Sequence, residues 1–253
     1  MSFEQHIFLS DVHLGAFSAK TNKQIEEDLL ALIEYCKQRH IELHILGDLF
    51  DYWMEFPEKG FVPQLGKNIL EAFQDYNETV SPALFVTGNH DNWTFGHFKE
   101  RGFDLEENFR LKEINGKRFL LMHGDGVAAA KIDFPRAAFH QLLRHSNFVN
   151  AYQKVLPPAT GLALMKKFSS LTRRRDNHNP EPLNRQAKKI FSRHRLDYII
   201  TGHDHVPRVE TFPQGRYINC GPFFNKRTLV LHTKDDTQLV TWNAEDKNFI
   251  PFG

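Results

Sequence analysis

The chain has 253 residues, of which 41% are hydrophobic and 25% are charged, and its net charge is +1. These proportions are ordinary for a globular protein and exclude a disordered, collagen-like or coiled-coil chain. No stretch approaches the roughly 18 uncharged apolar residues of a membrane span, and the first ten residues do not resemble a secretory signal. With Cys36 and Cys220 as the only cysteines, we expect a cytoplasmic protein without a disulfide framework.

The first 125 residues alternate between short apolar runs and segments of helical period, which is typical of βαβ units. The predicted elements are a strand at 6–10, a helix at 24–39, a strand at 43–46, a helix opened by Pro63 and a strand at 83–87. Asn115-Gly116 stands between two alternating runs, 110–114 and 117–122, and this arrangement strongly predicts a hairpin.

Residues 126–195 differ from the rest of the chain in charge and in pattern. They contain 14 Lys and Arg against 3 Asp and Glu, a balance of +11, while the remainder carries −10. They show apolar residues at helical spacing and no convincing strand, so we expect a basic helical insertion, or lid, within a single domain spanning 1–253. The asymmetry indicates an anionic partner: phosphate, nucleic acid or an acidic membrane surface. Strands are expected again at 198–201, 206–211, 216–219, 228–233 and 238–242.

Five short motifs lie mostly where predicted strands end. They are Asp11-Val12-His13, Gly47-Asp48-Leu49-Phe50-Asp51, Gly88-Asn89-His90-Asp91, His123-Gly124-Asp125 and Gly202-His203-Asp204-His205. Ligand sites of open α/β sheets lie outside the carboxyl ends of the strands, so five loops at one rim would bring these side chains together. A helix cap or a turn explains some of the motifs taken singly. All five in this order indicate a metal site.

The donor types of these motifs are carboxylate, imidazole and amide oxygen, without a thiolate. Such a set favours Mn, Fe, Zn or a similar pair of ions over a cysteine-based zinc site. Asp48, on a loop between the two halves, could bridge two ions. Two ions about 3.5–4 Å apart form the arrangement used for phosphoryl hydrolysis, because they lower the pKa of a shared water and neutralise phosphate charge.

In their order and with intact ligands, the five motifs resemble those of the calcineurin-like metallophosphoesterases. The resemblance covers the body of the chain and implies an α/β fold, a four-layer sandwich of two mixed β-sheets flanked by helices. It also implies a di-metal centre with Asp48 bridging. One ion would be held by Asp11, His13, Asp48 and His205, and the other by Asp48, Asn89, His123 and His203.

The same resemblance implies that His90 is not a ligand but faces the substrate, either as an acid for the leaving oxygen or as a cation beside the transition state. Asp91 is expected to orient the imidazole of His90. Asp51 is expected either to contact the site or lid or to cap a helix.

Part of the sequence resembles one branch of this family, the UDP-2,3-diacylglucosamine diphosphatases. The similar runs are 47–53, 87–93, 114–119 and 123–126, and the branch also carries a helical insertion after the His-Gly-Asp motif. The resemblance implies hydrolysis of a UDP-linked lipid to UMP and an acylated sugar phosphate in lipid A synthesis. The best-known enterobacterial-type members have arginine where this chain has His90, and a related branch with histidine is similar over most of its length.

A cluster of basic residues within the insertion comprises Lys166, Lys167, Arg173, Arg174 and Arg175. Arginine binds phosphate bidentately and lysine binds it as a point charge, so we expect the cluster to bind the substrate. Interleaved apolar residues suit an acyl-chain cleft or peripheral contact with the inner membrane face. A solvated helix face and packing against the sandwich are the alternatives. Nucleic acid is not expected, because the usual motifs are missing from the sequence.

An aromatic stretch comprises Phe50, Tyr52, Trp53, Met54 and Phe56. It could line a lipid pocket beside the metals or form core beneath the insertion. Two rival functions remain open from the sequence: a phosphodiesterase or phosphatase that acts on a nucleotide or phosphoprotein, and a non-catalytic scaffold of the same fold. The intact ligands and His90 argue against the scaffold.

Overall fold

The computed structural model describes residues 3–126, 132, 134–173 and 179–253. One sheet contains β1 (Gln5–Leu9), β2 (Glu42–Leu46), β3 (Leu84–Val86), β4 (Asp104–Glu106), β10 (Thr228–Thr233), β11 (Thr237–Asn243) and β12 (Asn248–Pro251). A second sheet contains β5 (Phe109–Ile114), β6 (Lys117–Met122), β7 (Tyr198–Thr201), β8 (Arg208–Phe212) and β9 (Gly215–Asn219). The helices are α1 (Ala19–Arg39), α2 (Lys67–Thr79), α3 (His97–Glu100), α4 (Ala138–Arg144), α5 (Ser146–Val155), α6 (Pro158–Arg173), α7 (Glu181–Phe191) and α8 (Phe223–Lys226), with a short 3-10 helix at Pro57–Lys59.

Both sheets are mixed. The strand order is β12-β11-β10-β1-β2-β3-β4 in the first and β5-β6-β7-β9-β8 in the second. Strands β1 to β4 run parallel, and β10 joins β1 in the antiparallel direction. In the second sheet β6, β7 and β9 are parallel. The β5–β6 hairpin predicted from the Asn-Gly pair is confirmed.

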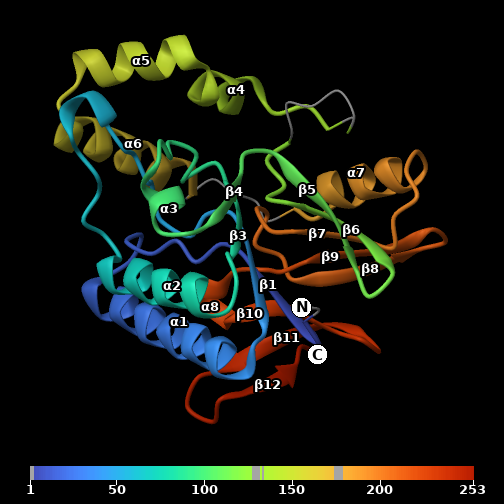
Figure 1. Ribbon diagram of the computed structural model, residues 1–253. Helices are drawn as coiled ribbons and strands as arrows, with labels where there is room; N and C mark the ends of the chain where they lie inside the picture. Colours follow the sequence, from blue (N-terminus) through green and yellow to red (C-terminus); the bar gives the residue numbers. More distant parts are fainter. Residues whose placement is uncertain (1–2, 127–131, 133, 174–178) are drawn as a thin grey trace.

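The two sheets lie face to face between layers of helices (Figure 1). Successive strand residues point to opposite faces: on β1, Ile7 and Leu9 pack with α1 and α2, whereas Phe8 packs toward the second sheet. On β6, Leu121 packs toward the first sheet and Leu120 packs with α7. The order of layers is therefore α1 and α2, first sheet, second sheet, and α7. This is the predicted four-layer α/β sandwich.

Two helix starts differ from those predicted. Helix α1 begins at Ala19 because the Ser18 side chain accepts a hydrogen bond from the Thr21 amide, at 3.2 Å, and so caps the helix. The expectation that Pro63 opens the next helix is wrong, because Gly66 has a left-handed backbone (φ 67°) and α2 starts only after it. The sequence also predicts neither β4 nor β12, which are edge strands of three and four residues.

The described residues of the basic segment contain α4 to α7 and no strand, in agreement with the sequence. Helix α7 is the outer layer of the sandwich, whereas α4, α5 and α6 lie together, apart from α7 (Figure 1). Leu143, Val149 and Met165, one from each of these three helices, pack on Tyr52 and Met54. The aromatic stretch therefore includes core beneath the helices, one of its two predicted roles. No helix in the described ranges is both long and apolar enough to cross a bilayer.

Candidate metal centre

The structure brings the predicted metal ligands to one edge of the sandwich. Asp11 and His13 follow β1, Asp48 follows β2, Asn89 follows β3, His123 follows β6, and His203 and His205 follow β7. Strands β1, β2 and β3 are parallel in the first sheet, and β6 and β7 are parallel in the second. Their carboxyl ends therefore open onto a common rim.

The backbone at this rim is unusual. Positive φ angles occur at Asp11 (51°), His13 (46°), Asp48 (55°), His203 (78°) and His205 (57°). Residues other than glycine seldom adopt this conformation. Each residue held in this conformation costs of order 1–3 kcal/mol, and such backbone strain concentrates at functional sites. Five of the seven predicted ligands therefore lie on tight turns that aim their side chains inward.

Gly88 also has a steric reason for its place in the third motif. A Cβ atom at Gly88 would overlap the Asp48 carboxylate. Glycine at this position therefore allows the β2 and β3 loops to approach each other closely.

The first group of donors is formed by Asp11, His13 and His205. Asp11 Oδ1 lies 3.3 Å from His205 Nε2 and 3.8 Å from His13 Nε2, and the two Nε2 atoms are 3.2 Å apart. Asp11 Oδ2 accepts hydrogen bonds from the Ser10 hydroxyl and the His203 amide. Oδ1 is buried without a hydrogen-bond partner in the described ranges. This orphaned oxygen, facing two imidazoles, fits a cation ligand.

Asp48 lies between the two sides of the site. Its Oδ2 atom is 3.6 Å from His13 Nε2, 3.4 Å from His123 Nε2 and 3.9 Å from His90 Nε2. Its Oδ1 atom accepts a hydrogen bond from the His90 amide, at 2.9 Å. This central position is the one required of a bridging carboxylate, and the bridging role stays a prediction.

The second group of donors contains Asn89, His123 and His203. Asn89 Oδ1 lies 3.0 Å from both His123 Nε2 and His203 Nδ1. His123 Nδ1 lies 2.8 Å from the Leu46 carbonyl. Because a carbonyl only accepts, Nδ1 must be the protonated nitrogen when His123 is neutral, which leaves Nε2 as the lone-pair donor.

The carboxylates of the site are strongly held in the anionic form. Burial would raise the pKa of Asp11, but the nearby imidazoles of His205 and His13 hold it well below its usual range. Burial would lower the pKa of His123, but the charge of Asp48 raises it to about 10. The negative charge that acts on His123 also favours a bound cation. The donor set fits two divalent ions of the Mn, Fe or Zn type.

The structure places Asp51, rather than Asp91, against His90. Asp51 Oδ1 lies 3.3 Å from His90 Nδ1. The expectation that Asp91 orients this imidazole is wrong, because both carboxylate oxygens of Asp91 accept hydrogen bonds from backbone amides. Its oxygens accept from the Gly88 and Leu49 amides, each at 2.7 Å, and so tie the β2 and β3 loops together.

Because the sequence predicts that His90 faces the substrate, and Asp51 lies against His90 without being a predicted ligand, Asp51→Asn is expected to lower turnover about 10- to 100-fold while metal content stays unchanged. Steady-state kinetics and metal analysis of the purified variant would check this. Glu58→Gln, a change at an exposed carboxylate on the same connection, is the control. Loss of metal in Asp51→Asn would contradict the assigned positioning role.

The comparison with known proteins agrees with this geometry. The model of the calcineurin-like phosphoesterase family matches residues 7–207. The chain belongs to this family. It is therefore a metal-dependent phosphoesterase, as the motifs predict, and the family implies divalent metals.

Three curated relatives of this phosphoesterase are named UDP-2,3-diacylglucosamine hydrolase. The protein from Porphyromonas gingivalis is 29% identical over 222 residues, which cover 79% of this chain and 82% of the relative. That from Photorhabdus laumondii is 27% identical over 216 residues, with coverages of 82% and 84%. That from Escherichia coli is 24% identical over 250 residues, with coverages of 92% and 97%.

Sequence reasoning missed a polar cluster that joins α4 to the metal loops of the phosphoesterase. Asp125 Oδ2 lies 3.2 Å from Arg144 Nη2, 3.3 Å from Arg136 Nε and 3.8 Å from His140 Nδ1. Arg144 Nη2 also donates to the Gly88 carbonyl, at 2.7 Å. The available signal was two arginines and a histidine shortly after the His-Gly-Asp motif, in a segment nearly free of acids.

A cleft of about 470 Å³ opens beside the metal-site histidines. Its lining residues include Asp125, Phe134, His140, Leu183, His203 and His205. Its size is within the range of small-molecule sites. The lining of this cleft combines polar groups of the phosphoesterase site with apolar side chains of the segment that follows β6.

The predicted basic cluster is only partly described. Lys166 and Lys167 lie on α6, the first half-buried and the second exposed. Arg173 ends α6, and Arg174 and Arg175 fall outside the described residues. The substrate-binding role of the cluster stays a prediction.

Proposed function

We propose that this phosphoesterase cleaves the diphosphate of UDP-2,3-diacylglucosamine, giving UMP and 2,3-diacylglucosamine 1-phosphate in lipid A synthesis. The single observation that carries the hydrolytic part is the position of Asp48 Oδ2, within 3.9 Å of His13, His90 and His123. The substrate assignment is supported by relatives of that printed name, aligned over most of both chains.

The proposed cofactor is a pair of divalent ions, Mn²⁺ first and Fe or Zn as alternatives. Asp11, His13, Asp48 and His205 would hold one ion, and Asp48, Asn89, His123 and His203 the other. When bound, such a pair lowers the pKa of water and offsets charge on the phosphate. The protein's own part is to hold these donors at fixed positions before the substrate arrives, through strained turns and the Asp11 and Asp91 hydrogen bonds.

His90 is the proposed catalytic residue of the chain itself. Asp51 faces Nδ1, and Nε2 points toward Asp48 and the ligand histidines. A protonated His90 would donate its Nε2 proton to the leaving oxygen, or hold positive charge beside the phosphate as the bond breaks.

Helices α4 to α6 are the proposed lid over the acylated part of the substrate. They pack on the aromatic stretch beside Asp48. Phe139, Val155 and Leu164 on these helices remain exposed. Apolar side chains in a basic segment suit acyl chains and an anionic membrane surface. We therefore place the enzyme in the cytoplasm, peripherally at the inner membrane face.

Product analysis by phosphorus NMR tests this function. The manganese-loaded enzyme is expected to release UMP from UDP-2,3-diacylglucosamine, and a chelator is expected to abolish the reaction. A panel of nucleotide diesters and a phosphopeptide serves as the comparison. Faster turnover of a panel member would favour the rival phosphodiesterase or phosphatase. Metal binding without turnover of any substrate would favour the scaffold.

Neutralising Arg173, Arg174 and Arg175 together is expected to reduce turnover of the lipid substrate strongly, while hydrolysis of a p-nitrophenyl phosphodiester changes little. The reason is that the basic segment attracts anionic lipid, at about 1 kcal/mol per basic residue near a membrane, but contains none of the predicted metal ligands. Binding to anionic vesicles should fall at low salt, and the difference should shrink as salt rises. Equal losses on both substrates would indicate a defect of the fold or metal site.

A further inference from the structure

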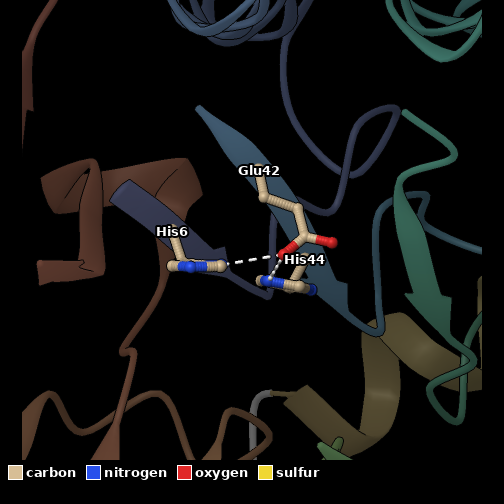
Figure 2. Close-up of side chains that lie close together, drawn as sticks. All are labelled: His6, Glu42 and His44. Carbon is tan, nitrogen blue, oxygen red and sulfur yellow. Dashed lines mark ion pairs between the residues drawn. The ribbon is translucent and has the colours of Figure 1, made fainter. Parts of the chain in front are cut away.

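A second cluster of metal-ligand side chains lies near the amino-terminal ends of β1 and β2. Figure 2 shows its members: His6 on β1, and Glu42 and His44 on β2. His6 and Glu42 are paired in the parallel register. His6 shares a strand face with Phe8, and His44 shares one with Leu46. Phe8 and Leu46 both pack between the two sheets, so the cluster faces the same space.

This cluster is separate from the catalytic site. His6 lies five residues before Asp11, and Glu42 lies six residues before Asp48. At about 3.3 Å per strand residue, these separations correspond to roughly 17–20 Å. The two sites therefore lie toward opposite ends of the same strands.

The ligand atoms of the cluster converge. Glu42 Oε2 lies 2.8 Å from His6 Nδ1 and 3.4 Å from His44 Nε2. One donor atom from each residue falls within 4.8 Å of the others. Both histidines are buried, and apart from their contacts with Glu42 no ring nitrogen of either has a hydrogen-bond partner in the described parts of the chain. Unsatisfied buried nitrogens are costly, and a cation between them would satisfy one on each ring.

Lys112 fixes the carboxylate from the other sheet. Its Nζ atom lies 2.5 Å from Glu42 Oε1, which leaves Oε2 directed at the histidines. Such outer contacts orient the ligands of metal sites. The side chain of Glu42 is 13% exposed, so the cluster has a route to solvent.

We propose that His6, Glu42 and His44 bind one transition-metal ion, of which Zn²⁺ is the best match, independently of the catalytic pair. Two imidazoles and one carboxylate form an established zinc donor set. The ion would link β1 to β2 and stabilise this end of the sheet. His232 on β10 is the nearest other imidazole, and its Nδ1 atom already lies 2.8 Å from the Thr237 hydroxyl.

Counting bound ions tests the proposal. Protein stripped with a chelator, loaded with Zn²⁺ alone and analysed by mass spectrometry is expected to hold three ions per chain. His44→Gln and His6→Gln are expected to hold two and to keep their manganese-supported activity. His194→Gln, at a partly exposed histidine beyond α7, is the matched control and should keep three. Counts in His44→Gln and His6→Gln equal to that of the wild-type protein would overturn the proposal, whereas a wild-type count below three that still falls by one in these variants would question the catalytic pair instead.

Thermal unfolding provides a second measurement that separates the two sites. In an Asp48→Asn background, Zn²⁺ at about 100 times its Kd for the cluster should raise Tm by about 5–10 °C. Adding Glu42→Gln or His44→Gln should abolish that rise. An equal rise in the double variants would show that Zn²⁺ acts elsewhere and would overturn the proposal.

Discussion

Asp48→Asn is expected to weaken binding of both catalytic ions and to reduce turnover by more than about 10²-fold. The side chain keeps its size, and its Oδ1 atom can still accept from the His90 amide, so the loop geometry should survive. The negative charge between the two donor groups is lost. Loss of an outer-sphere partner alone typically costs 10- to 100-fold in affinity or activity, and a shared ligand is expected to cost more. Metal content by mass spectrometry and kcat on the UDP-lipid are the measurements.

The control for this change is Asp75→Asn, at an exposed carboxylate paired with Lys37. It should leave both metal content and turnover unchanged. If Asp48→Asn retained two ions and near-normal turnover, the bridging assignment would be wrong. Loss of one ion with retention of the other would make Asp48 a ligand of a single site.

His90→Ala is expected to lower turnover by about 10²- to 10⁴-fold while both ions remain bound. This is the usual range for removal of a positioned acid or base. Asp51 faces Nδ1 of this imidazole and so directs Nε2 into the site. Single-turnover kinetics would show whether the loss lies in the chemical step.

Metal analysis decides between the two possible roles of His90. Its Nε2 atom is close enough to His13 and Asp48 to complete a three-donor group. A variant that loses an ion would therefore make His90 a ligand and contradict the catalytic assignment. His194→Ala, remote from the rim, is the control and should retain full activity.

Much of the fold was predictable because its signals are local. The β5–β6 hairpin follows from Asn115-Gly116 between two alternating runs, and β1, β2 and β7 follow from short apolar runs. Helix α2 was placed too early because Pro63 is a common first helix residue, whereas the actual start depends on the conformation of Gly66. Glycine is favoured at this position because the φ is positive and because a Cβ atom on Gly66 would overlap the Phe50 ring.

The sequence predicted which residues form the candidate metal centre, but it did not predict which of their side chains contact one another. The motifs place Asp, Asn and His at strand ends, and parallel strands bring those ends to one rim. Which carboxylate meets His90 depends on how two loops about 40 residues apart hydrogen-bond to each other. Asp91 is adjacent to His90 in sequence, yet it binds the Leu49 amide, and Asp51 takes the position beside the imidazole.

The sequence by itself determined the donor chemistry, the α/β class and the helical nature of the basic segment, because residue type and periodicity are local properties. Tertiary structure alone decided which of α4–α7 pack on the aromatic stretch and which on the sandwich, the link from Arg144 to Asp125, and the convergence of His6 with Glu42 and His44. Neither His6 nor Glu42 belongs to any motif. They meet because β1 and β2 pair in one particular parallel register, and a shift of one residue would turn one of them to the opposite face of the sheet.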